Sequence, residues 1–184
     1  LSAILYAPPH FFANSLLEKQ GLYIEGSLRK KVKKVTLKDS SGNVNFYMIP
    51  YADPAEVREL YSDDSIKTHD DAMKLIISKI NKEFNSDERN VAVAHGFITY
   101  MKDGEDGCHL EVSDSERPLS IGGTDIVSAK YFEEFNYTAL GHLHGAQKVG
   151  SDKMRYGGSL IKYSFSEVTQ KKVFTLVDLD DKGE

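Results

Sequence analysis

The sequence Tyr137-Thr138-Ala139-Leu140-Gly141-His142-Leu143-His144-Gly145 places two histidines directly after a short apolar run. Residues 137–140 have the pattern of a β-strand that is buried on both faces. Side chains two positions apart on an extended chain point the same way, so we expect His142 and His144 to face one cavity. The flanking glycines allow the backbone to turn and another group to approach closely.

A second buried strand precedes a third histidine. Val91-Ala92-Val93-Ala94 is continuously apolar, and His95 follows it directly. In open α/β sheets ligands bind at the carboxyl ends of the strands, so we expect all three histidines at one edge of a sheet. Imidazole binds zinc, copper, iron, nickel and manganese, and such a metal beside a phosphate group indicates hydrolysis. The alternative for His95 by itself is a hydrogen-bonded structural histidine.

The rest of the chain predicts helices and strands around these two segments. The alternating residues 34–38 and 43–48 flank the turn Asp39-Ser40-Ser41-Gly42, which predicts a β-hairpin. Asp53-Pro54 has the chemistry of a helix start. The other expected elements are helices over 15–20, 70–84 and 128–135 and strands over 22–24 and 171–179. We therefore expect one α/β domain over residues 1–184, in which residues 1–14 stay unassigned.

Composition limits the classes of protein to which the chain can belong. It has 184 residues, a net charge of −5 and one cysteine, Cys108. A single cysteine excludes an internal disulfide framework and suits the reducing cytoplasm. The net charge gives no global attraction to nucleic acid or lipid, and no apolar run approaches the ~18 residues of a membrane span. The chain begins at Leu1 rather than Met, so we expect a processed or truncated piece of a longer protein.

Several other segments have plainer interpretations. The basic residues 29–34 could contact phosphates, but they border a strand whose outer face must be polar, so we favour a solvated surface. Gly122-Gly123 could form an anion-binding nest, although a plain turn is favoured. Ser159 lacks the Gly-x-Ser-x-Gly context of a nucleophile, and Cys108 has no adjacent base. We assign no catalytic residue.

Three stretches of the sequence resemble the SbcD family of bacterial nuclease subunits. They are residues 115–125, 137–147 and 155–167, and residues 90–97 match upstream of them. The resemblance covers roughly residues 15–180. Because SbcD proteins are calcineurin-like metallophosphoesterases, it implies a four-layer α/β/β/α sandwich of two β-sheets flanked by helices. This chain would hold part of that sandwich, with the N-terminal half incomplete.

The resemblance also implies an activity. SbcD-type proteins are manganese-dependent nucleases with two metal ions, and they act with the ATPase SbcC on DNA ends and hairpins in repair and recombination. Carried over residue by residue, the likeness implies that His95 and His142 bind one Mn²⁺ and that His144 binds the other.

The chain departs from the family in one large respect. The family's Asp-x-His, Gly-Asp-x-x-Asp and Gly-Asn-His-Asp motifs, which precede the matched region, do not occur in this chain. They supply the bridging carboxylate that offsets the repulsion between two cations. We therefore expect the C-terminal half of a nuclease domain, inactive by itself and completed by another polypeptide or by self-association as a homodimer. The alternatives are a catalytically inactive scaffold and a phosphoesterase that acts on small molecules.

Overall fold

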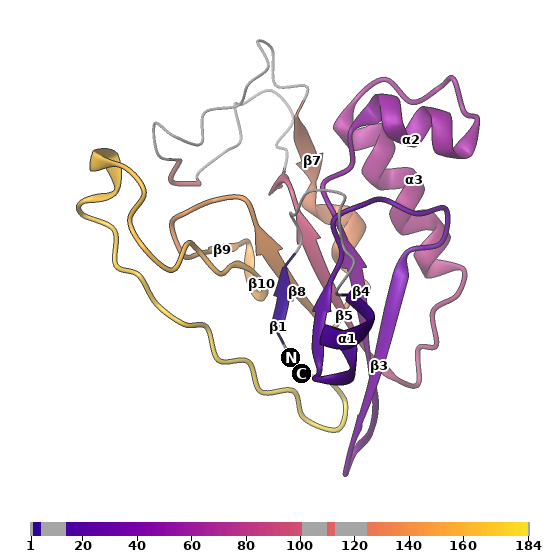
Figure 1. The fold of residues 1–184 in the computed structure, drawn as a ribbon, viewed down its shortest axis with the longest axis horizontal. Coiled ribbons are helices and arrows are strands. Elements are labelled where there is room, and N and C mark those ends of the chain that lie inside the picture. The colour runs from indigo at the N-terminus through magenta and orange to yellow at the C-terminus, as the bar shows by residue number, and fades with distance from the viewer. Residues whose placement is uncertain (1, 5–13, 101–109, 113–124, 184) are drawn as a thin grey trace.

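The computed structural model describes residues 2–4, 14–100, 110–112 and 125–183, which form a mixed α/β fold (Figure 1). In chain order the first elements are β1 (Ser2–Ile4), α1 (Asn14–Lys19), β2 (Leu22–Ile24), β3 (Lys33–Asp39), β4 (Gly42–Ile49), α2 (Pro54–Tyr61), α3 (His69–Asn81) and β5 (Arg89–His95). They are followed by β6 (Phe97–Thr99), β7 (Ile126–Ser128), the 3₁₀ helix η2 (Ala129–Phe132), β8 (Tyr137–Gly141), β9 (Gln147–Val149), β10 (Ser151–Tyr156) and the 3₁₀ helix η3 (Phe165–Glu167). The expected α/β class is confirmed. The expectations for Cys108, for Gly122-Gly123 and for most of the 115–125 motif lie outside the described residues.

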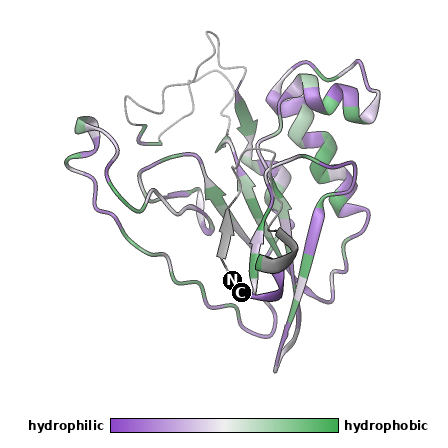
Figure 2. Ribbon diagram, in the orientation of Figure 1, coloured by the Kyte–Doolittle hydropathy of each residue, from purple (hydrophilic) through white to green (hydrophobic). Residues whose placement is uncertain are grey.

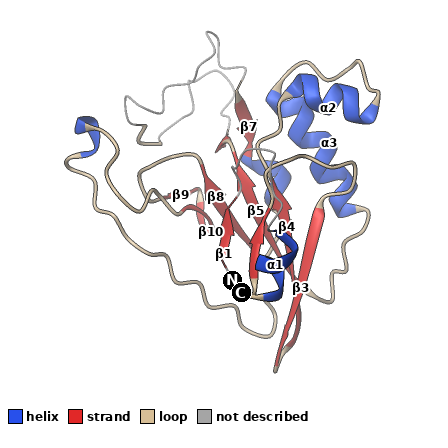
Figure 3. Cartoon of the chain, viewed as in Figure 1, coloured by secondary structure: helices blue, strands red, loops and turns tan. Residues whose placement is uncertain are grey.

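A six-stranded sheet forms the centre of the molecule (Figure 3). Its strand order is β3-β4-β5-β8-β10-β9, in which β4, β5, β8 and β10 run parallel and the edge strands β3 and β9 are antiparallel to their neighbours. The short strands β1 and β2 form a separate parallel pair, as do β6 and β7. Because β5 and β8 are parallel neighbours, their carboxyl ends meet at one edge, as the two histidine-bearing segments predicted.

The predicted hairpin is present as β3 and β4. The register pairs Val35 with Phe46 and Asp39 with Gly42. The Asp39 carboxylate closes the turn by accepting the N–H of Ser41 at 2.8 Å, and it also forms an ion pair with Arg89 of β5 at 2.5 Å. The hairpin is thus joined to the central strands by charge as well as by the strand ladder, while β3 itself remains largely hydrophilic (Figure 2).

Both longer helices begin at the capping residues that their sequences supply. Asp53 accepts the N–H of Ala55 at 2.8 Å ahead of Pro54, so α2 starts where the sequence predicted. Thr68 and Asp71 form a reciprocal capping box at the start of α3. The predicted helix over 70–84 is confirmed in α3, although the helix ends at Asn81. Phe84 leaves the helix and stacks on Tyr47 at 5.6 Å.

The two faces of the sheet are covered to different extents. Helices α2 and α3 lie together on one side of the sheet (Figure 1), where the buried side chains of α3 pack against those of β4 and β5: Met73, Ile76, Ile77 and Ile80 with Tyr47, Ile49, Ala92 and Ala94. On the other face Met48, Val91 and Tyr137 are buried, whereas Phe46, Val93 and Ala139 are only partly buried. This unequal cover is compatible with part of the layered sandwich that the resemblance implies.

Two predictions for the second half of the chain are wrong in type or extent. Residues 171–179 alternate but form no strand, and Phe174 and Leu176 are 91% and 88% exposed. Alternation produces a strand only where a neighbouring strand accepts its hydrogen bonds, and these residues pair with no described strand. The helix predicted over 128–135 is only the short turn η2. No helix in the described ranges is long and apolar enough to cross a membrane.

Candidate functional site

His95 and His142 lie side by side at the carboxyl ends of β5 and β8. His95 is the last residue of β5 and is in register with Gly141, the last residue of β8. His142 follows immediately, and the two imidazole rings are 5.4 Å apart in an edge-to-face arrangement at 84°. The ring of Phe97 lies 6.3 Å from the His142 ring. Two of the three predicted histidines are thus brought together by neighbouring parallel strands.

Gly141 provides the space for the His95 ring. A Cβ atom at position 141 would lie 3.0 Å from Nδ1 of His95, which is tighter than an ordinary van der Waals contact. The backbone around it is also joined across the strands, because the N–H of Gly96 donates to the carbonyl oxygen of Gly141 at 3.3 Å. The glycine before the two histidines therefore permits a close approach, as its position in the sequence predicted.

Tyr156 of β10 holds the chain that follows His95. Its side chain is completely buried. The hydroxyl oxygen accepts the N–H of Ile98 at 2.6 Å and lies 3.0 Å from the carbonyl oxygens of both Gly96 and Ile98, to which the hydroxyl can donate. The position of His95 is thus supported from two sides, by the strand β8 and by this tyrosine.

Burial keeps the His95 ring neutral. Desolvation by burial, and to a smaller extent the nearby His142 ring, which opposes a second positive charge, lower the pKa of His95 to about 4. A neutral imidazole retains a nitrogen lone pair near pH 7, which is the form that binds a metal ion.

The backbone of His142 has an unusual conformation. Its φ angle is +124°, a region that is costly for a residue with a Cβ atom. Non-glycine residues in such conformations cost about 1–3 kcal/mol and cluster at functional sites. We expected His142 and His144 to point the same way because both would lie on one extended segment. That extended segment ends at Gly141.

His144 lies beside a carboxylate from a later part of the chain. Its Nδ1 atom lies 2.8 Å from Oε1 of Glu167, and its ring lies 5.4 Å from that of Tyr163. Within the described ranges, no three or more histidine, cysteine, aspartate or glutamate side chains converge as a metal site. The structure therefore brings His95 and His142 together and joins His144 to Glu167 by a hydrogen bond.

Glu167 is the centre of a hydrogen-bond network. Its side chain is fully buried, and its Oε2 atom accepts a hydrogen bond from Nζ of Lys172 at 2.8 Å and from the N–H of Tyr163 at 3.2 Å. These donors, Lys172 first and His144 next, lower the pKa of Glu167 to about 2 in spite of its burial. An ionised carboxylate only accepts hydrogen bonds, so Nδ1 of His144 carries a proton and donates it to Glu167.

Residues 157–159 support the backbone of His144. Gly158 has a φ of +75°, and a Cβ atom there would lie 2.9 Å from the backbone nitrogen of Ala146. The N–H of Ser159 and Nζ of Lys172 both donate to the carbonyl oxygen of His144, at 3.1 and 3.0 Å. Ser159 is therefore a structural residue here, in agreement with its lack of a nucleophile motif.

The sequence reasoning assigned no role to Glu167, Lys172 or Tyr156. Glu167 ends one of the family-like stretches, yet its carboxylate reaches His144 across 23 positions of the chain. No local spacing indicates a pair so distant in sequence, although a glutamate that is fully buried in a polar segment is itself informative once burial is known.

The side chains fit part of a transition-metal site. Two adjacent imidazoles, one held neutral by burial, and a third oriented by a carboxylate are donors that Mn²⁺, Zn²⁺ and related ions accept. The three rings provide nitrogen only, so they lack the oxygen ligands that Mn²⁺ also prefers.

Comparison with known proteins shows which proteins the chain is similar to. No protein-family model matches the chain. The SbcD component of the nuclease SbcCD from Staphylococcus saprophyticus subsp. saprophyticus, a curated protein, is 32% identical to it over 171 residues. The match covers 93% of this chain but 42% of the relative, so the chain spans less than half the length of the curated relative that it matches. The likeness to this type of nuclease component, expected from the motifs, is confirmed.

Proposed function

We propose that this chain is the C-terminal half of the nuclease domain of a metal-dependent nuclease subunit, which hydrolyses phosphodiester bonds in DNA. The premise is that the chain is a relative of SbcD along 93% of its length. The observation that supports the chemistry is the pairing of His95 with His142 at the ends of two parallel strands, with ring centres 5.4 Å apart. That edge of a parallel sheet is where α/β proteins bind their ligands.

In this proposal His95 and His142 hold one Mn²⁺ and His144 holds the second. Bound metal ions would polarise the phosphate and supply hydroxide at neutral pH. The chain's own contribution is to keep His95 neutral by burial, to hold the backbone after it through Tyr156, and to fix the proton of His144 on Nδ1 through Glu167. The strained backbone of His142 places that imidazole beside His95.

The proposed site needs ligands beyond those of this chain. Carboxylates would come from sequence absent here, from a second copy of the chain or from another polypeptide. The relative is named as one component of a nuclease called SbcCD, which supports a second subunit as partner. In this proposal that partner is the SbcC-type ATPase that the resemblance implies, and the place of action is the cytoplasm. The partly buried second face of the sheet supports completion by a further layer.

A second candidate function is a catalytically inactive scaffold. It is favoured by one observation, that the described residues hold no cluster of three potential metal ligands.

A nuclease assay separates the two. We expect the full-length protein to cleave linear DNA with Mn²⁺, the 184-residue chain to give no turnover, and His142→Ala in the full-length protein to abolish cleavage without unfolding it. His69→Ala is the matched control, because His69 pairs with Asp125 instead. Cleavage by the His142→Ala variant would refute the ligand assignment, and an inactive full-length protein would favour the scaffold. Light scattering after size-exclusion chromatography tests self-association.

A further inference from the structure

A pocket lined by lysines lies where α3 ends beside the β3–β4 hairpin. Its volume is about 260 Å³, and four segments that are distant in sequence line it: the chain before and at the start of β3, the strand β4, the end of α2 and the end of α3. The lining residues are Lys30, Lys31, Val32, Lys34, Tyr47, Tyr61, Lys79, Ile80, Lys82 and Glu83. None of them belongs to the histidine site.

The charge of this pocket opposes that of the whole chain. Five lysines and one glutamate line it, although the net charge of the chain is −5. The glutamate, Glu83, pairs with Lys31 at 3.0 Å. No further carboxylate lines the pocket among the described residues, and its lysines are exposed, so they create a local positive potential at a concave surface.

The pocket is held in shape by contacts of its own. The hydroxyl of Tyr61 donates to the carbonyl oxygen of Lys30 at 3.0 Å, which fixes the chain before β3 against the end of α2. Nζ of Lys79 lies 4.7 Å from the centre of the Tyr61 ring, a cation–π distance. Tyr47 and Ile80 are buried and form the floor. The lysines therefore converge on a preformed surface, which a simple solvated strand edge would not require.

We propose that this pocket, here named the lysine pocket, binds a phosphate group of a DNA backbone. Ammonium groups bind phosphates as point charges, and phosphate contacts position a protein on nucleic acid independently of sequence. Affinity for phosphate follows from the pocket itself, whereas DNA as its source rests on the proposed function. The pocket deepens that function by adding a DNA contact that is separate from the metal ligands.

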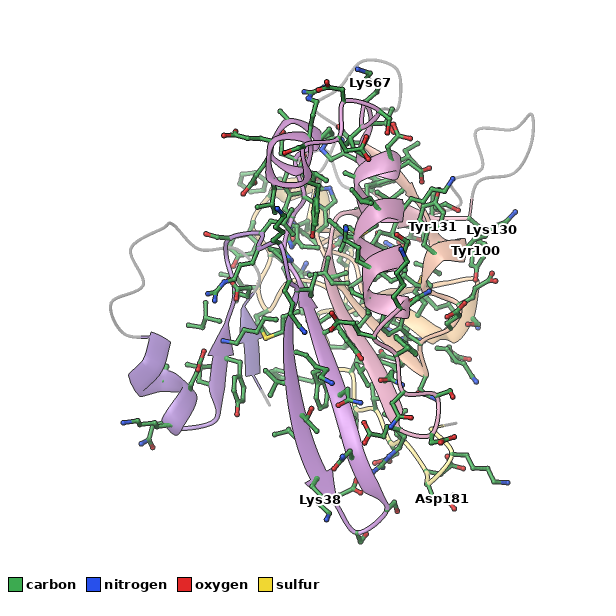
Figure 4. All side chains as sticks on the ribbon, turned by 90° about the vertical axis from the view of Figure 1, so that its right-hand side faces the viewer. Lys38, Lys67, Tyr100, Lys130, Tyr131 and Asp181 are labelled. Atoms are coloured by element: carbon green, nitrogen blue, oxygen red, sulfur yellow. The ribbon has the colours of Figure 1, made fainter. Side chains whose placement is uncertain are left out.

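The test measures binding of a fluorescently labelled DNA duplex to this chain by anisotropy over a series of salt concentrations. Removing a phosphate contact reduces the slope of log K against log salt by about one. Because Lys79 and Lys82 line the pocket proposed for a single phosphate, the double variant Lys79→Gln/Lys82→Gln should reduce the slope by about one. The matched control is Lys38→Gln/Lys67→Gln, which removes the same charge at the hairpin tip and ahead of α3, away from the pocket (Figure 4). The control slope should stay close to wild type.

Other outcomes would overturn the proposal. Equal loss in both double variants would show a response to overall charge only. If the pocket variant loses binding of inorganic phosphate but binds DNA as well as the wild type does, DNA is not the source of the phosphate group. Binding to phosphatidylserine vesicles without binding to DNA would also overturn DNA as that source. This test measures binding and no nuclease activity. A smaller slope of log K against log salt in the pocket variant would therefore support phosphate binding by the lysine pocket even if the full-length protein fails to cleave DNA.

Discussion

Nδ1 of His144 lies 2.8 Å from Oε1 of Glu167, a carboxylate that is fully buried yet ionised. Lys172 makes this possible, because its Nζ atom contacts the second carboxylate oxygen at 2.8 Å and also donates to the backbone of His144 at 3.0 Å. A buried charge that is paired and hydrogen-bonded in this way is strongly tied to its partners. The orientation of the His144 ring is therefore set by residues much later in the chain.

Removing this carboxylate should weaken metal binding in the full-length protein. We expect Glu167→Ala to lower Mn²⁺ affinity about 10- to 100-fold, and Glu167→Gln to have a smaller effect because an amide oxygen still accepts the Nδ1 proton. Isothermal titration calorimetry gives the affinity, and ¹⁵N NMR reports the tautomer of His144. Glu25→Gln is the control, since Glu25 is also buried but pairs with Arg29. Unchanged affinity in Glu167→Ala would show that Glu167 has only a structural role.

The strained backbone at His142 predicts an inverted order of stability for two variants. Alanine is normally more favourable than glycine in ordered structure by about 0.5–1 kcal/mol. At a φ of +124° the order should reverse, so we expect His142→Gly to be more stable than His142→Ala by about 1 kcal/mol or more. Urea denaturation of the two variants measures the difference. If the alanine variant is the more stable of the two, the conformation of His142 is not strained.

The hydroxyl of Tyr156 should contribute measurably to stability. Tyr156→Phe leaves the buried N–H of Ile98 without this acceptor, which costs about 1–3 kcal/mol. Tyr61→Phe provides a comparison, because its hydroxyl contacts carbonyl oxygens near the surface, and we expect a smaller loss there. Chemical denaturation of both variants decides the matter, and equal losses would contradict a special role for the contact beside His95.

Acid should destabilise the fold through His95. The unfolded chain protonates this residue near its ordinary pKa of 6.5, whereas the folded chain does so only near 4. Between these values the unfolded state binds more protons, so the free energy of unfolding falls as the pH is lowered through this range, by at most about 1.4 kcal/mol per pH unit. The stability that Glu167 provides is lost in a lower window, as its pKa falls from 4.5 in the unfolded chain to about 2 in the folded one.

Denaturation at a series of pH values tests the assignment to His95. We expect His95→Gln to lose the component that lies between the unfolded and folded pKa values of His95, 6.5 and about 4, and to keep the one at lower pH. A variant whose stability follows the wild-type pH profile throughout would show that another group is responsible.

Much of the fold follows from local patterns. The continuously apolar run before His95 and the alternation of β3 and β4 predicted strands, and Asp53 and Thr68 stand where the helices begin. The strand β10 was missed, because only Met154 and Tyr156 of its six residues are buried and no alternation marks it. The tail over 171–179 shows the opposite error, since its pattern is that of a strand but no described strand pairs with it.

The site was predictable only in part. The meeting of His95 with His142 follows from two buried parallel strands, and this much the sequence indicates. The positive φ angle of His142 was not predicted, because sequence patterns assign such a conformation to glycine. The partners of His144 were not predicted either. Its partners Glu167 and Lys172 are 23 and 28 positions away, so only the folded chain shows them.

The strand order of the large sheet has a consequence for the newly synthesised chain. β3, β4, β5 and β8 add to the sheet in the order in which a ribosome produces them, so the sheet can grow at a single edge. β9 then emerges before β10 but docks outside it, so the edge of β8 stays open until Tyr156 has left the exit tunnel. A nascent chain that stalls after β8 but before β10 has left the exit tunnel would expose that edge to other chains, and such arrested products should depend most on chaperones.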